Sequence, residues 1–303
     1  MNFTALRVAD YERLYSFFQN QPYPLSPYCL ASLIAWSGQG YRSHWAVVGD
    51  TLLIGNEPTQ DKGELHLLLP IPAGGEEPSP EQLGQLARQA GFGTYWHAPS
   101  TYMEKYTWEW IEGLFRVSEQ PEYEDYVYLR DDLALLKGNR FAKKRNLIHQ
   151  FTRAYAAERV VVESMSAVNA AESIAFLLQW CELRACDVEQ RESLACEKQA
   201  IITTIENLEA IGSAGILIRI DGVVSAFGMG SRLREDTGVL NFEKALSSIK
   251  GLYQFLDREC ARRLFPGCRY INKECDMNIP NLAQAKKSYN PIMMIKSYRL
   301  EVL

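Results

Sequence analysis

The 303-residue sequence lacks several patterns that would assign it to a simple class. No apolar run approaches the roughly 18 residues that a membrane-spanning helix needs. Residues 1–15 contain early acids and no apolar core of a signal peptide. The seven cysteines include no CxxC pair and the four histidines are scattered, so neither a disulfide framework nor a zinc site is favoured. We therefore expect a cytoplasmic protein with no transmembrane segment and no metal site.

The sequence also lacks an overall excess of positive charge. Its net charge is −5, so no global field draws the chain to nucleic acid or to an anionic membrane. Its length leaves room for about two domains. The positive charge is concentrated in residues 133–157, which hold six lysines and arginines and no acid. That segment carries +6, and the remainder of the chain therefore carries −11 against the total of −5.

Hydrophobic periodicity predicts alternating strands and helices in the second half of the chain. An Asp221-Gly222 pair between two apolar runs is a strong signal for a β-hairpin. The predicted order is a strand (158–165), two helices (166–187 and 193–212), the hairpin (215–233), a strand (237–246), a helix (250–265), a strand (268–275), a short helix (279–289) and a closing strand or pair (292–303). This order is similar to that of the Gcn5-related N-acetyltransferase (GNAT) fold.

The first half repeats this order less clearly. The predicted elements are helices at 10–20 and 26–38, a hairpin at 44–54, a strand at 63–71, a helix at 79–91, a strand at 92–98, a helical turn at 99–106 and a strand at 107–117. The fold class is therefore predicted as α+β with mixed sheets, in two tandem GNAT-like domains joined by a basic helix. The predicted units are residues 1–125, a linking segment at 126–157, and residues 158–303, which carry the candidate site.

The linking segment has a polarised helical pattern. Phe141, Ile148, Phe151 and Tyr155 fall on one face, and the cations crowd the remainder. Lysine and arginine bind phosphate through charge and directed donors, so this surface is a candidate phosphate contact. A solvated face that only aids solubility is the alternative. The candidate ligands for phosphate are Lys143, Lys144 and Arg145.

The strand at 237–246 mixes charged and apolar residues. Regular alternation places Val239, Asn241, Glu243 and Ala245 on one side, and the even-numbered residues with Lys244 on the other. Because burying an unpaired charge is costly, Glu243 and Lys244 either form ion pairs or face a cleft. A carboxylate here could take a proton from the nucleophile in an acyl transfer.

The turn before the helix at 250–265 contains Lys250 and Gly251. In acetyltransferases, a glycine-rich turn at this place holds a coenzyme pyrophosphate at the helix N-terminus. The single glycine argues against ordinary acetyl-CoA binding and leaves room for another phosphorylated donor.

The stretch YINKECDMNIPNLAQAKKSYNP, residues 270–291, carries a cluster of acids. A calcium loop that starts at Asp276 would have Asn281 and Lys287 at the positions that require glycine and an acid, so that motif is excluded. Alternation predicts Asn272, Glu274 and Asp276 on one face. Lys286 and Lys287 are available as their counter-charge. This row would line a gap beside the strand at 237–246.

Three stretches, at 126–151, 241–260 and 270–300, resemble a bacterial family of unknown function that is related to the C-terminal catalytic domain of phosphatidylglycerol lysyltransferase. The resemblance implies a tandem acetyltransferase-like fold. Enzymes of that kind move an aminoacyl group from tRNA to a lipid hydroxyl. The family pattern falls on Lys144, Arg145 and Asn146; on Glu243, Lys244 and Gly251; on Asn272, Glu274 and Asp276; and on Lys286, Tyr289 and Pro291.

The sequence departs from this family in two places. No counterpart of the membrane-spanning half of the full lysyltransferase is found, which argues against a lipid acceptor. Asn278 also stands where many relatives have glycine.

The resulting hypothesis is an acyl- or aminoacyltransferase that uses an activated ester, with aminoacyl-tRNA or a coenzyme A thioester as the donor. Glu243 or Asp276 would bind the donor amino group or act as base, and Tyr289 would protonate the leaving oxygen. The remaining substrate-binding candidates are Lys244, Asn272, Glu274 and Lys286, with Lys143, Lys144, Arg145, Lys250 and Gly251 on phosphate. The expected partners are a small or lipid-derived acceptor and a tRNA acceptor end, and the oligomeric state is left open.

Two alternatives remain at this stage. One is an acetyl-CoA-dependent N-acetyltransferase that acts on a small amine. The other is a non-catalytic module that binds RNA or a phosphorylated metabolite through the basic helix, with binding that falls steeply with salt.

Overall fold

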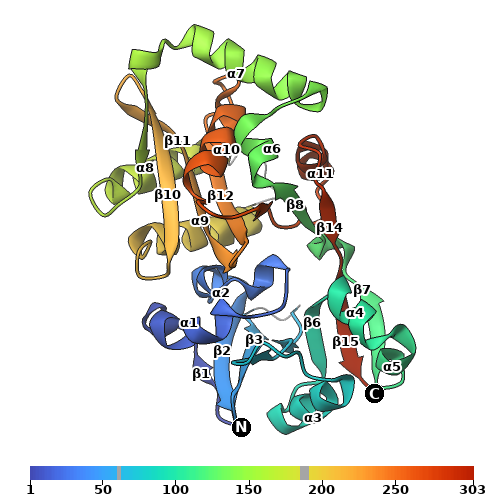
Figure 1. The fold of residues 1–303 in the computed structure, drawn as a ribbon. Coiled ribbons are helices and arrows are strands. Elements are labelled where there is room, and N and C mark those ends of the chain that lie inside the picture. Colours follow the sequence, from blue (N-terminus) through green and yellow to red (C-terminus); the bar gives the residue numbers. More distant parts are fainter. Residues whose placement is uncertain (60–62, 185–190) are drawn as a thin grey trace.

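The computed structural model describes residues 1–59, 63–184 and 191–303. Over these residues the chain forms two mixed β-sheets, which lie one above the other in Figure 1 with helices packed on each. Helix α2 (Leu30–Trp36), which packs with the first sheet, also packs against α9 (Arg191–Glu206) of the second. Short 3₁₀ turns lie at Val8–Asp10, Ser26–Tyr28, Pro121–Tyr123, Asn139–Phe141 and Ala157–Arg159.

The first sheet has the strand order β1-β2-β3-β4-β6-β15-β7, with β5 paired to β3. Its strands are β1 (Thr4–Ala5), β2 (Tyr41–Val48), β3 (Thr51–Pro58), β4 (His66–Leu68), β5 (Ile71–Pro72), β6 (Thr94–Pro99), β7 (Phe115–Glu119) and β15 (Ser297–Val302). Its further helices are α1 (Tyr11–Gln19), α3 (Pro80–Ala90), α4 (Ser100–Tyr106) and α5 (Trp108–Glu112). Strands β4 and β6 run parallel, and the other neighbours run antiparallel. The predicted hairpin at 44–54 is confirmed as β2 and β3.

The second sheet has the order β14-β8-β13-β12-β11-β10-β9. Its strands are β8 (Asp125–Leu129), β9 (Val160–Ser164), β10 (Ser213–Ile220), β11 (Val223–Arg234), β12 (Thr237–Ala245), β13 (Tyr270–Asn272) and β14 (Met293–Ile295). Its further helices are α6 (Arg130–Leu135), α7 (Ala142–Ala154), α8 (Ala170–Arg184), α10 (Leu252–Arg263) and α11 (Pro280–Lys287). The predicted Asp221-Gly222 hairpin is confirmed: both residues have positive φ, at 52° and 82°, as a type I′ turn requires.

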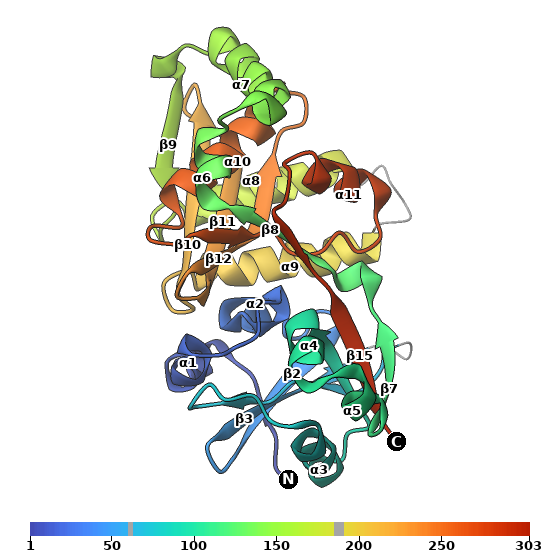
Figure 2. The same cartoon turned by 45° about the vertical axis from the view of Figure 1, so that its right-hand side comes forward.

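The end of the chain links the two sheets. Residues 292–303 were predicted to close the second unit, but they divide between the sheets, as Figure 2 shows. Strand β14 forms an edge of the second sheet, whereas β15 lies in the first sheet between β6 and β7. There Leu300 is paired with Tyr95 on one side and Val117 on the other, so β15 supplies ladder hydrogen bonds to both neighbours.

The predicted basic linking helix is interrupted and does not lie between the sheets. Leu136 and Gly138 have positive φ, at 50° and 87°, and separate α6 from α7. Helix α7 packs on α10, and Figure 1 shows it at the end of the molecule away from the first sheet.

One further prediction differs from the structure. Residues 108–112 form α5, and the strand predicted there begins only at Phe115. The aromatic residues of this segment favoured a strand. Of residues 108–112, however, only Ile111 is buried, while Trp108 and Trp110 are exposed. One apolar residue facing the core fits a short surface helix. The helix predicted at 166–187 is α8; residues 185–187 lie outside the described residues.

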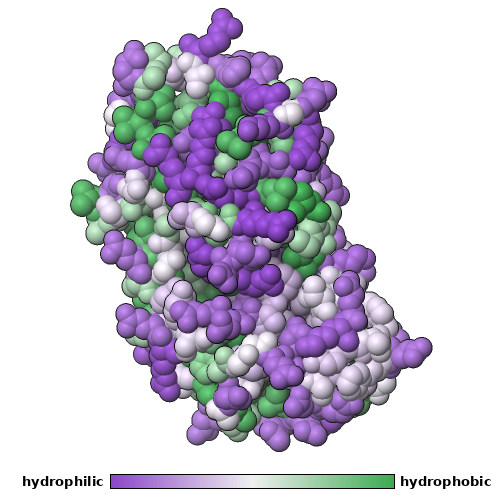
Figure 3. Space-filling model, in the orientation of Figure 1, coloured by the Kyte–Doolittle hydropathy of each residue, from purple (hydrophilic) through white to green (hydrophobic). Residues whose placement is uncertain are grey.

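The largest buried apolar cluster continues across the two sheets. It is centred on the first sheet and also contains Leu233 and Val239 of the second. Figure 3 shows a mainly hydrophilic surface with a hydrophobic strip on the right, at the height of α11. The exposed apolar residues of α11, its approach and β14 are Met277, Ile279, Leu282, Ile292, Met293 and Met294.

Candidate functional site

Strands β12 and β13 are paired over a short stretch and then separate. Their parallel register joins Thr237 to Tyr270, Gly238 to Ile271, and Val239 to Asn272. Beyond it, β12 is bulged at Asn241 and the chain after β13 turns through Glu274, which has φ of 58°. We call the space bounded by residues 241–243 and 273–274 the strand divergence. Side chains, not ladder hydrogen bonds, connect the two strands there.

The bulge changes which residues of β12 share a face. Leu240 and Ala245 both belong to the core on the α10 face of the sheet, although five positions separate them and a regular strand would place them on opposite faces. Glu243 is on this same face, whereas Lys244 points to α8 and α9. The prediction that Asn241 and Glu243 share a face is therefore wrong, because one extra residue reverses the alternation.

On the α10 face of the sheet, Lys273 bridges the strand divergence. Its Nζ lies 2.9 Å from Glu243 Oε2 and 2.5 Å from Asp257 Oδ2, which comes from α10. We call these three residues the acidic cradle. The second oxygen of each acid, Glu243 Oε1 and Asp257 Oδ1, is buried and has no hydrogen-bond partner among the described residues. An unpaired buried acceptor is costly, so the acidic cradle is suited to an additional donor.

Burial and charge set the protonation of the acidic cradle. Burial alone would lower the pKa of Lys273, but the charges of Asp257 and Glu243 outweigh it and hold that pKa well above its usual range. Burial raises the pKa of Glu243 to about 7, and the charge of Asp257 acts in the same direction while Lys273 opposes it. Glu243 is thus a carboxyl that changes protonation near neutral pH, which suits a general base.

Tyr289 and Lys144 flank the acidic cradle. The Lys273 Nζ lies 5.0 Å from the centre of the Tyr289 ring, and the Lys144 Nζ lies 3.7 Å from it. Tyr289 is buried, and burial, reinforced by the charge of Asp257, raises the pKa of its hydroxyl well above the usual value. Lys144 comes from α7 and donates to Ser288 Oγ at 2.6 Å. Its burial lowers the pKa of Lys144 to about 8.

The opposite face of the strand divergence carries a second polar network. Asn241 Nδ2 donates to Glu274 Oε1 at 3.1 Å and to Ser32 Oγ of α2 at 2.8 Å. Asn272 Nδ2 donates to Asp125 Oδ2 at 2.8 Å. Burial raises the pKa of Glu274 to about 7. This network joins the second sheet to helix α2 of the first half.

The structure does not place Asn272, Glu274 and Asp276 in one row. Asn272 and Glu274 contact each other, because the Glu274 amide donates to Asn272 Oδ1 at 2.7 Å. Asp276 instead accepts a hydrogen bond of 2.6 Å from Tyr126, whose ring lies in the core on the α10 face. The predicted alternation fails because β13 ends at Asn272 and the chain then turns through the positive φ of Glu274.

The two predicted substrate-binding lysines, Lys244 and Lys286, already bind other groups of the protein. Lys286 Nζ donates to the carbonyl oxygens of Lys273, Glu274 and Cys275, at 2.5, 3.0 and 2.5 Å. A lysine has three such donors, so Lys286 fixes this loop. Lys244 pairs with Glu197 at 2.7 Å. Their roles in binding substrate stay predictions.

The five predicted phosphate ligands lie in different surroundings. Lys143 and Lys250 are exposed, and Lys144 reaches Tyr289. Arg145 donates to the carbonyls of Leu136 and Gly138 after α6. Gly251 has φ of 84° and packs under α7, so that an added Cβ would lie 2.1 Å from the Leu147 carbonyl oxygen. This contact gives Gly251 a packing role, and phosphate binding stays a prediction.

Sequence reasoning missed two members of the acidic cradle, Asp257 and Lys273. Asp257 follows Phe255 and Leu256 on α10 and is itself buried, so it interrupts an apolar face. Lys273 is a cation directly after the buried Ile271 and Asn272. Asp257 is a lone acid and Lys273 a lone base, each beside buried residues. Because an unpaired buried charge is costly, this pattern could have predicted that the two form an ion pair.

The described residues contain no group of three or more His, Cys, Asp and Glu side chains placed to hold a metal ion. In the same part of the chain, no helix combines the length and apolarity that a membrane span requires.

Comparisons with solved structures give two close matches in fold. A conserved protein of unknown function from Bacteroides thetaiotaomicron shares 26% identity, covers 100% of both chains and superposes with a TM-score of 0.89. The C-terminal domain of a putative lysylphosphatidylglycerol synthetase from Agrobacterium fabrum shares 13% identity over 96% of this chain and 91% of that one, with a TM-score of 0.62. The second likeness shows a shared fold.

No curated protein matches the chain. A family model does match, and it extends over residues 23–301, so it includes the second sheet, the first sheet apart from β1, and every residue of the acidic cradle. The chain therefore belongs to the family described as phosphatidylglycerol lysyltransferase, C-terminal.

Proposed function

We propose that this protein is an acyltransferase that moves an aminoacyl group from an activated ester to a small or lipid-derived acceptor. Family membership supports the acyl-transfer class. The observation that carries the finer proposal is the acidic cradle, in which the buried Glu243 Oε1 and Asp257 Oδ1 have no hydrogen-bond partner in the described part of the chain. An aminoacyl donor brings an ammonium group, which an acetyl donor lacks.

The proposed architecture is a tandem of two GNAT-like units. Each sheet contains three antiparallel strands, then a helix, then a strand that pairs in parallel with the third strand. In the first sheet these elements are β2, β3, β4, α3 and β6. In the second sheet they are β10, β11, β12, α10 and β13. This repetition supports two units that divide near residue 125, although β8, α6 and α7 of the predicted link belong with the second sheet and β15 lies in the first. The acidic cradle belongs to the second parallel pair.

In the proposed reaction, Asp257 Oδ1 accepts a hydrogen bond from the donor ammonium and positions the ester. Glu243 takes the proton from the acceptor nucleophile as its oxygen or nitrogen bonds to the carbonyl carbon. The bond from that carbon to the leaving oxygen then breaks, and Tyr289 gives its proton to that oxygen. Glu243 returns a proton to Tyr289 at the end of the cycle, so the protein is unchanged. Lys273 holds both carboxylates in place.

Exposed cations support a phosphate-bearing donor such as aminoacyl-tRNA. Lys143 is exposed on α7, the same helix that sends Lys144 to Tyr289. Lys250 is exposed two residues before α10, the helix that carries Asp257. Long-range attraction of a polyanion by such side chains weakens with salt.

The test is single-turnover transfer with lysyl-tRNA and, separately, acetyl-CoA, with phosphatidylglycerol vesicles or a small amine as the acceptor. We expect transfer from lysyl-tRNA. Glu243→Gln should lower its rate constant by about 100-fold or more, and Asp257→Asn should mainly weaken donor binding. Glu158→Gln, an exposed change, is the matched control.

Three results would overturn the proposal. The first is transfer from acetyl-CoA alone. The second is unchanged transfer and donor binding in folded Glu243→Gln and Asp257→Asn proteins. The third is salt-sensitive tRNA binding with no turnover from either donor, which would indicate a binding module.

A further inference from the structure

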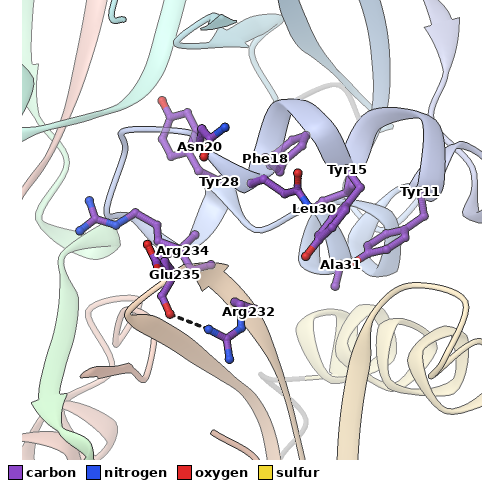
Figure 4. Close-up of a pocket in the computed structure, with 12 residues that line it drawn as sticks. Tyr11, Tyr15, Phe18, Asn20, Tyr28, Leu30, Ala31, Arg232, Arg234 and Glu235 are labelled. Carbon is purple, nitrogen blue, oxygen red and sulfur yellow. Dashed lines mark hydrogen bonds between the residues drawn. The ribbon is translucent and has the colours of Figure 1, made fainter. Parts of the chain in front are cut away.

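A pocket separate from the acidic cradle lies where α1 and α2 meet the turn between β11 and β12. It has a volume of about 300 Å³. Figure 4 shows Tyr11 and Tyr15 of α1 on one side, and Arg232, Arg234 and Glu235 on the other. The pocket is thus formed jointly by the two halves of the chain, and clefts between such units commonly bind small molecules.

The α1 side of this pocket is aromatic. The rings of Tyr11 and Tyr15 are stacked, with centroids 5.4 Å apart and planes at 25°. They recur at helical spacing with Phe18, which is buried and also lines the pocket. Burial raises the pKa of Tyr11 to about 12, so its hydroxyl stays neutral. Leu30 and Ala31 of α2 add apolar surface. This wall suits a planar ring.

The opposite side carries two arginines and the acid Glu235, and Arg234 also pairs with Asp236 at 3.7 Å. Arg232 and Arg234 are two positions apart on β11 and both line the pocket. Arg232 donates to the carbonyl oxygens of Glu235 and Pro266, at 2.5 and 3.1 Å. Within residues 1–59, 63–184 and 191–303, no carboxylate forms a salt bridge with it, so its charge is not neutralised. An anion is the natural counterpart of such a guanidinium.

We infer that this pocket binds a nucleoside monophosphate, with the base against the Tyr11–Tyr15 pair and the phosphate toward Arg232 and Arg234. The aromatic wall selects for the base, since every base has a π-face that stacks on tyrosine. Arg232, which forms no salt bridge with a carboxylate among the described residues, selects for the phosphate. The pocket's volume lies at the small end of ligand sites and suits one nucleotide. This inference does not depend on the acyl-transfer proposal, because the two sites share no residue.

The test is calorimetric titration of the full chain with AMP, adenosine and inorganic phosphate. We expect one saturable AMP site, with adenosine and phosphate each weaker by about tenfold or more. Tyr15→Leu removes the stacking surface, and Arg232→Gln removes the charge. Each should weaken AMP binding by about tenfold. Arg159→Gln, an exposed arginine paired with Asp221 on another surface, should bind AMP like the unmodified protein.

The titrations of the unmodified protein test the inference even if a variant fails to fold. No saturable AMP binding at about 1 mM would overturn the inference. So would inorganic phosphate that binds as well as AMP, or AMP affinity unchanged in folded Tyr15→Leu and Arg232→Gln proteins.

Discussion

Lys273 crosses the strand divergence to Glu243, with 2.9 Å between Nζ and Oε2. Lys273 directly follows β13, and Glu243 lies four positions beyond Val239, the last residue of β12 that is paired with β13. The same ammonium also reaches Asp257 of α10, so one cation joins two strands and a helix. In a regular parallel pair, backbone hydrogen bonds would occupy this place. Their replacement by side-chain ion pairs makes this part of the sheet dependent on charge.

Lys273→Met should therefore destabilise the fold strongly. It leaves two buried carboxylates without their cation, and removing one partner of a buried ion pair costs about 3–5 kcal/mol. Denaturant unfolding measures the loss. The triple change Lys273→Met, Glu243→Gln and Asp257→Asn should regain part of it, because no uncompensated charge remains. Lys287→Met, at an exposed position of α11, should change the unfolding free energy little. Equal losses in the two single variants would contradict this account.

The pH dependence of transfer follows from Glu243. Its pKa is raised to about 7, so its basic form accumulates as the pH rises through 7. The single-turnover rate should increase over about one unit on each side of pH 7 and then level off. A rate that is flat between pH 6 and 8, with the enzyme intact, would argue against Glu243 as the base.

The same shift has a consequence of opposite sign for stability. Between the usual carboxyl pKa of 4.5 and about 7, the folded protein holds a proton on Glu243 that the unfolded chain has lost. Stability contributed by that proton is present at low pH and declines as the pH rises through this window. Glu274 has the same direction of shift and adds to the slope. Unfolding midpoints across pH 5–7 should show a shallower decline in Glu243→Gln than in the unmodified protein.

Gly251→Ala should destabilise the packing of α7 on α10. Its φ of 84° costs a side-chain-bearing residue about 1–2 kcal/mol, and the new Cβ would also meet the Leu147 carbonyl oxygen. Gly222→Ala is the matched control, since Gly222 has φ of 82° with nothing within 4 Å. The denaturation midpoint should fall further for Gly251→Ala than for Gly222→Ala. Equal falls in the two denaturation midpoints would show that α7 moves to accept the new Cβ at little cost.

Asp125→Ala should loosen the joint between the two halves. This buried acid accepts from the Ser26 amide and hydroxyl, at 2.6 and 3.0 Å, and from Asn272. Each buried donor left unpaired costs about 1–3 kcal/mol. Thermal unfolding and protease sensitivity of the loop near Ser26 measure the effect. Glu158→Ala changes an exposed acid away from this joint and should have little influence on either readout.

Local sequence signals predicted much of the secondary structure. The Asp221-Gly222 turn, the amphipathic α10 and the start of α11 at Pro280 were all predicted, because each depends on neighbouring residues alone. The helix at Trp108–Glu112 was missed, since burial of Ile111 outweighed the strand preference of its aromatic neighbours.

The candidate site was less predictable for a related reason. Glu243 and Tyr289 were identified, and the structure places both around Lys273. The predicted faces were wrong because the bulge at Asn241 and the turn at Glu274 each interrupt the regular alternation on which the prediction relied. Asp257 and Lys273 become partners only when α10 packs on the sheet, a contact that sequence spacing does not contain.

The position of β15 constrains the order in which the protein can assemble during translation. Residues 115–119 and 94–99 leave the ribosome almost two hundred residues before 297–302, the strand that fills the space between them. Until then β6 and β7 each present an unpaired edge, which is a template for pairing with other chains. The first sheet is therefore open to mispairing at these two strands until residues 297–302 have been synthesised.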